Sequence, residues 1–150
     1  MKYTKSIALI TCLVSLPLLT GCPSDNTNSN NNPTTPPPPG NAPSSLSGKT
    51  LSVSVSGGAS PFASGGSYVF TPSGSGTSGT YSLQGSGGVQ SNIGNYTYST
   101  TGSNTASLVE SEQSGTIVNN TLVFQSNSTG TISSSSPNVG GNQSGSFTLN

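Results

Sequence analysis

A two-residue alternation of apolar and polar side chains, repeated from residue 46 to the C-terminus, most constrains the fold of this chain. Leu51, Val53 and Val55 alternate with serines, and similar short runs recur downstream. Glycine-rich turn signals separate these runs at intervals of roughly 8 to 15 residues. No window shows the 3.6-residue period of an amphipathic helix. The sequence therefore predicts an all-β domain of about eight short strands over residues 46–150.

Short strands that follow one another and each carry one apolar face favour an antiparallel meander. A closed barrel is preferred to a sandwich, because only 4% of the residues are charged and few charges protect exposed strand edges. The side chains predicted to point inward are Leu51, Val53, Val55, Tyr68, Phe70, Tyr81, Leu83, Tyr96, Tyr98, Ala106, Leu108, Leu122, Phe124, Phe147 and Leu149.

Two glutamates fall in phase with this inward set. The alternation that carries Ala106 and Leu108 inward would next bury Glu110 and Glu112, which is costly for unpaired carboxylates. We expect either that the strand leaves the core near Leu108 or that a bulge at Val109 reverses its faces. The two carboxylates have roughly the separation of an inverting glycosidase pair, about 6.6 Å, but neighbours on one strand cannot flank a scissile bond. A solvated strand end is the preferred interpretation.

Few other residues support catalysis or cofactor binding. The chain has no histidine, and Gly74–Gly79 matches a dinucleotide-binding glycine pattern but leads into a predicted strand rather than a helix. Lys49 is the only cation beyond residue 5, so no basic stripe for nucleic acid exists. We predict a non-enzymatic protein with no catalytic residues, no metal site, no cofactor and no nucleic-acid partner.

The first residues have the parts of an export signal: Lys2 and Lys5, an apolar run, and a small-residue cleavage site. The ending Leu19-Thr20-Gly21-Cys22 resembles the lipobox of bacterial lipoproteins. This resemblance implies a signal peptide over residues 1–21, acylation of Cys22 with palmitate-like chains, and retention on a membrane. Two or three such chains make attachment effectively permanent.

Between the anchor and the strands lies a segment without large apolar side chains. Residues 22–45 begin with an Asn/Ser-rich stretch and continue with prolines at 33 and 36–39. We expect a disordered linker with a stiff polyproline portion that holds the domain away from the lipid. A proline-rich ligand for an aromatic groove is the alternative.

The segments Gly94–Tyr98, Gly102–Leu108, Leu122–Phe124 and Gly145–Leu149 carry a second resemblance. They are similar to a Gly/Thr-rich module of secreted bacterial proteins that is expected to form a small calycin-like barrel. The similarity covers roughly residues 46–150 and implies a fold, with no defined activity and no catalytic residues.

Two functions follow as hypotheses. The leading one is a lipid-anchored, non-catalytic module with a structural or interaction role at the cell envelope. The alternative is a calycin-like binding protein for a small apolar ligand, with a pocket formed by Tyr68, Tyr81, Tyr96 and Tyr98; a cavity at one barrel end would favour it. Because Pro23 stands where Asp would, by resemblance, signal inner-membrane retention, we expect the outer membrane.

Overall fold

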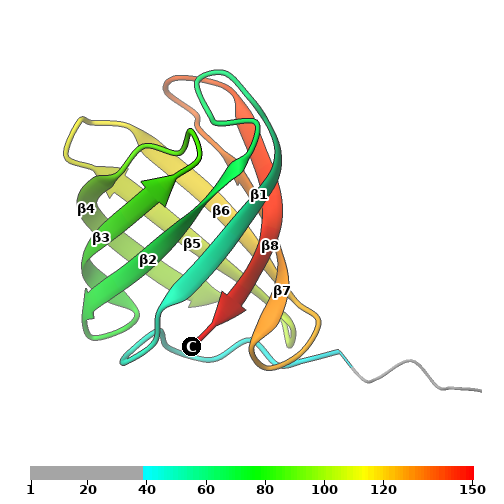
Figure 1. Ribbon diagram of the computed structural model, residues 1–150. Coiled ribbons are helices and arrows are strands. Elements are labelled where there is room, and N and C mark those ends of the chain that lie inside the picture. Colours follow the sequence, from blue (N-terminus) through cyan, green and yellow to red (C-terminus); the bar gives the residue numbers. More distant parts are fainter. Residues whose placement is uncertain (1–38) are drawn as a thin grey trace, which may run out of the picture. The chain divides into compact units, whose positions relative to one another are not determined.

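The computed structural model describes residues 39–150 (Figure 1). The predicted signal peptide 1–21, the cleavage residues Leu19, Thr20 and Gly21, the acylated Cys22 and most of the linker lie outside the described residues. The described part contains eight strands: β1 (Leu51–Ala59), β2 (Gly66–Gly74), β3 (Ser78–Ser86), β4 (Asn92–Thr100), β5 (Thr105–Glu112), β6 (Ile117–Phe124), β7 (Thr129–Ser135) and β8 (Asn142–Leu149).

The strands form a closed antiparallel barrel (Figure 1). Each strand pairs with the next one in sequence, and β1 pairs with β8 through a register that includes Leu51 opposite Leu149. The predicted fold class, an all-β meander closed into a barrel, is confirmed. Closure gives both edges of the first and last strands a partner, as expected for strands with few protecting charges.

The alternation along each strand generates the core. All fifteen side chains predicted to point inward are buried, and Leu46, Val118 and Ile132 join them. Aromatic rings pack inside the barrel: Phe70 stacks on Tyr81 with ring centroids 4.9 Å apart, and Phe124 meets Phe147 edge-on at 4.9 Å, where β6 and β8 end.

A bulge in β1 shapes one end of the barrel. The register with β8 shifts between Val55 and Gly57, and pairing with β2 ends at Val55 while pairing with β8 continues to Ala59. The last residues of β1 therefore separate from β2. This separation, with the strong local twist that bulges produce, leads the β1–β2 loop over the barrel mouth.

The opposite end is closed by the segment that precedes β1 (Figure 1). Leu46 is only 1% exposed, its backbone N–H donates to the carbonyl of Gly76 at 2.9 Å, and the Tyr98 hydroxyl donates to the carbonyl of Pro43 at 2.7 Å. Ala42 N–H also donates to Ser103 O at 2.9 Å. Ala42 and Pro43, which lie in the predicted linker 22–45, therefore contact the barrel. Small residues and prolines at 39–45 gave no apolar pattern from which this packing could be inferred.

Candidate functional site

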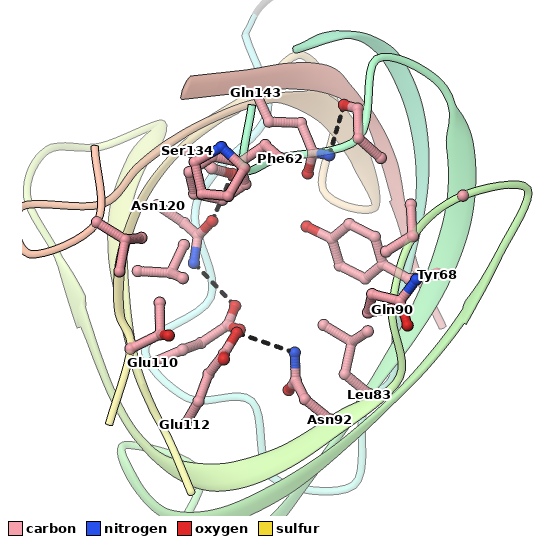
Figure 2. A pocket seen from close by; sticks show the side chains of 17 residues that line it. Phe62, Tyr68, Leu83, Gln90, Asn92, Glu110, Glu112, Asn120, Ser134 and Gln143 are labelled. Atoms are coloured by element: carbon pink, nitrogen blue, oxygen red, sulfur yellow. Dashed lines mark hydrogen bonds between the residues drawn. The ribbon is translucent and has the colours of Figure 1, made fainter. Parts of the chain in front are cut away.

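A cavity of about 280 Å³ opens at the end of the barrel that residues 39–50 leave uncovered. Its walls come from the inner faces of the strands and from the loops β1–β2, β3–β4, β5–β6 and β7–β8. Apolar residues form part of the wall: Pro61, Phe62, Ala63, Leu83, Gly88, Val89, Val118 and Val139. Polar side chains form the rest: Tyr68, Gln90, Asn92, Glu110, Glu112, Thr116, Asn120, Ser134 and Gln143 (Figure 2).

Glu110 is the buried acid of this cavity. Strand β5 keeps its alternation without a bulge, with Glu110 opposite Tyr96 on one neighbour and Val118 on the other. Glu110 is 3% exposed, whereas Glu112 is half-buried at the mouth. The predictions that the strand leaves the core near Leu108, bulges, or ends in solvated carboxylates are therefore wrong for Glu110. A hydrogen bond from Asn120 on the neighbouring strand β6 reduces the cost on which those predictions rested.

A hydrogen-bonded chain across three strands supports the acid (Figure 2). Asn120 Nδ2 on β6 donates to Glu110 Oε1 at 2.8 Å and to the carbonyl of Leu108 at 3.0 Å. Ser134 Oγ on β7 donates to Asn120 Oδ1 at 2.6 Å. The buried amide therefore uses its oxygen and its nitrogen, as buried polar groups in folded proteins generally do.

Burial controls the protonation of the acid. Desolvation raises the pKa of the Glu110 carboxyl to about 8, against the opposing effect of the hydrogen bond from Asn120, and the nearby Glu112 raises it further. The acid is therefore mostly neutral near pH 7. Burial also raises the pKa of Tyr68 and of Tyr81, and the charge of Glu110 adds to both shifts.

The mouth of the cavity is held by side-chain contacts. Asn92 Nδ2 donates to Glu112 Oε1 at 3.1 Å, while the buried Asn92 Oδ1 has no hydrogen-bond partner among the described residues. Ser114 Oγ donates to Glu112 Oε2 at 2.8 Å. Gln143 Nε2 donates to the carbonyl of Ala63 at 3.0 Å and fixes the β1–β2 loop over the opening (Figure 2).

The four tyrosines predicted to line a pocket have different positions. Tyr68 lines the cavity, and its hydroxyl points into it (Figure 2). Tyr81 is not on the cavity wall, and its buried hydroxyl lies close to the Glu110 carboxyl. Tyr96 packs edge-on against Phe70, and Tyr98 contacts the segment that closes the other end. Tyr68 is thus the one member of the predicted set on the cavity wall.

The sequence analysis did not predict that the amide side chains of Gln90, Asn92, Asn120 and Gln143 and the hydroxyl of Ser134 line the cavity. The signal for Asn120 was present, because Val118, Asn120, Leu122 and Phe124 share one phase of β6. Extending the inward phase of Leu122 and Phe124 by one step would have placed Asn120 inside. Gln90 and Gln143 carry no comparable signal, since their positions depend on loops and on the barrel end.

Residues 39–150 contain no group of three or more His, Cys, Asp or Glu side chains that could hold a metal ion. Nor does this range include a helix long and apolar enough to cross a membrane. Comparison with protein-family models, with curated proteins and with solved structures finds no match to this chain.

Proposed function

We propose that this chain is a lipid-anchored envelope protein whose barrel binds a small molecule in its open end. The observation that carries the proposal is the cavity of about 280 Å³ into which the Tyr68 hydroxyl points and whose wall includes the buried Glu110. A concave site with an apolar wall and a few convergent polar groups is the usual form of a small-molecule site.

The uneven filling of the barrel favours binding over a purely structural role. Aromatic rings pack inside the barrel, and the other end is closed by Leu46. A barrel of eight strands is just wide enough either to fill with side chains or to hold one small ligand. Here the open end keeps space next to buried polar groups, which a domain needed only as a spacer or contact surface does not require.

The proposed location depends on the sequence. The lipobox-like Leu19-Thr20-Gly21-Cys22 supports acylation of Cys22, and Pro23 supports the outer membrane. The Asn/Ser-rich and proline-rich composition after Cys22 supports a spacer between the anchor and the barrel.

The proposed role is binding without catalysis. Glu110 and Glu112 are neighbours on the same face of β5, so they cannot act from two sides of a bond. The Glu110 carboxyl is also engaged by Asn120, and the chain has no histidine to serve as a general base.

Native mass spectrometry of the protein purified from its own cells tests both parts of the proposal. We expect an acyl mass on the N-terminal cysteine and a noncovalent ligand mass that is lost on mild activation. Cys22→Ala should remove the acyl mass and release the protein from membranes. Wild-type protein without the acyl mass would contradict the proposed lipid anchor on Cys22.

A variant that fills the cavity tests the binding site separately. Leu83→Trp adds volume at the cavity wall, whereas Ile93→Trp adds the same ring at an outward position that is 54% exposed. We expect the ligand mass to disappear in Leu83→Trp and to persist in Ile93→Trp. Folded wild type that carries no ligand would return the protein to a structural or interaction role, and equal occupancy in both variants would place the ligand outside this cavity.

A further inference from the structure

The charges of the barrel are concentrated at the cavity. Among residues 39–150 the charged side chains are Lys49, Glu110 and Glu112. Both glutamates line the cavity, whereas Lys49 precedes β1 at the closed end. The cavity wall therefore carries two acidic side chains and no cationic side chain.

Glu110 is also incompletely paired. Its Oε1 accepts from Asn120 Nδ2 at 2.8 Å, and the Tyr81 hydroxyl lies close to the carboxyl group. The neighbouring Tyr81 hydroxyl is buried without a partner. A buried acid with no counter-ion destabilises a fold, and an apolar residue of similar volume would ordinarily be cheaper. Because an ionised carboxylate can accept about four hydrogen bonds, Glu110 keeps acceptor capacity at the cavity wall.

We propose that the ligand is a small organic cation, an ammonium group attached to an apolar body; this inference rests on the proposed binding function. The ammonium would lie against Glu110, with the Glu112 carboxylate contributing from the mouth. Its apolar body would contact Phe62, Leu83 and Val118.

The size of the cavity limits the ligand. An apolar cavity of about 150 Å³ accommodates one benzene molecule in another protein. The cavity here, at about 280 Å³, therefore suits a single ring with a short aminoalkyl chain and excludes peptides or long polyamines in an extended form.

Binding of a cation should release a proton. An ammonium beside Glu110 favours its carboxylate form, which is the minor form near pH 7 in the empty cavity. The titratable groups that face Glu110 are Tyr68, Tyr81 and Glu112; both tyrosines stay neutral while Glu110 ionises, because burial raises their pKa above the ordinary value. Alkyl ammonium groups stay charged to about pH 10. Affinity should therefore rise by roughly tenfold or more between about pH 6 and pH 8, as Glu110 ionises.

Isothermal titration calorimetry of the purified full-length mature protein tests the inference with three probes of similar size: phenethylamine, phenethyl alcohol and phenylacetate. We expect phenethylamine to bind at least tenfold more tightly than the other two, and its observed enthalpy to change with the ionisation enthalpy of the buffer near pH 7. Preferential binding of the alcohol or the acid would contradict the proposal of a cationic ligand without contradicting the binding function. Failure of all three probes to bind would also contradict the proposal of a cationic ligand. Native mass spectrometry of the co-purified ligand tests the binding function independently.

Two matched variants locate the effect. Glu110→Gln removes the buried charge and keeps an acceptor for Asn120; we expect at least a tenfold loss of phenethylamine affinity and no buffer-dependent enthalpy. Glu112→Gln, at the mouth, should cause a smaller loss and retain proton release. If Glu110→Gln does not fold, the pH dependence of phenethylamine affinity in the wild type is the test: it should level off above about pH 8, where Glu110 is ionised, whereas entry of the neutral amine would raise it further, up to about pH 10. Equal phenethylamine affinity in the wild type and in folded Glu110→Gln would overturn the proposal.

Discussion

The side-chain amide of Asn120 joins the buried acid Glu110 to the neighbouring strand through a 2.8 Å hydrogen bond. The same nitrogen donates to the carbonyl of Leu108, and its oxygen accepts from Ser134. This arrangement keeps the acid inside the barrel without a counter-ion. It also ties the protonation of one side chain to the stability of three strands.

The stability of the barrel should depend on the protonation of Glu110. Its pKa in the folded state is about 8, above the ordinary value of 4.5. The folded state therefore binds more protons than the unfolded state between these values, so the free energy of unfolding should fall as pH rises from about 4.5 to about 8 and then level off. The loss should amount to a few kcal/mol. Urea denaturation at several pH values measures it.

Glu110→Gln is the control for this pH dependence. The amide cannot ionise and still offers an oxygen to Asn120, so the decline between about pH 5 and pH 8 should largely disappear. A wild-type protein with a flat profile, or a variant with an unchanged decline, would contradict the assignment to Glu110.

Removal of the supporting amide should destabilise the fold. Asn120→Leu leaves Glu110, the Leu108 carbonyl and Ser134 with lost partners in a buried site, which should cost roughly 2 to 4 kcal/mol in the free energy of unfolding. Chemical denaturation near pH 7 measures this cost. Asn119→Leu, at the exposed neighbouring position, should stay within about 1 kcal/mol of wild type.

A double substitution tests whether the two side chains act together. Because the cost of Asn120→Leu includes the unpaired acid, the same change in a Glu110→Gln background should be less costly than in wild type. Strictly additive free energies would show that Asn120 stabilises the barrel independently of the acid.

The fold was predictable from the sequence because one rule, inward-outward alternation, operates along every strand. Fifteen inward positions followed from it, from Leu51 to Leu149. The same rule places Glu110 inward, and the prediction that Glu110 leaves the core is wrong. The cost of burying its carboxyl group is reduced by Asn120, which lies on another strand.

The cavity was less accessible to sequence reasoning. Whether an inward tyrosine fills the barrel or lines a space depends on its height along the axis, which follows from strand register rather than from alternation. Tyr68 and Tyr96 have the same pattern in sequence, yet Tyr68 faces the open end and Tyr96 packs against Phe70. The closure of the other barrel end by Leu46 likewise depends on contacts between residues that are distant in sequence, such as Leu46 and Gly76.

A glycine in β7 should tolerate no side chain. A Cβ at Gly130 would collide with the Val123 carbonyl and lie 2.7 Å from Cζ of Phe147. Gly130→Ala should therefore destabilise the barrel by roughly 1 to 3 kcal/mol, because both neighbours are held in the packed sheet. Gly65→Ala, where nothing lies within 4 Å, is the matched control. Equal midpoints of thermal unfolding for the two variants would contradict the tight approach of β7 to Phe147.

The segment before β1 should contribute to folding as part of the core. Leu46 is 1% exposed and lies where residues 39–50 cover the barrel end, so Leu46→Ala removes buried methyl groups and leaves a space that the surrounding strands can close only in part. The expected loss is about 2 to 5 kcal/mol in the free energy of unfolding, measured by urea denaturation. Ile93→Ala, at an outward position that is 54% exposed, should cost less than about 1 kcal/mol. If both substitutions cost the same small amount, residues 39–50 lie on the barrel without stabilising it, and the folded domain begins at β1.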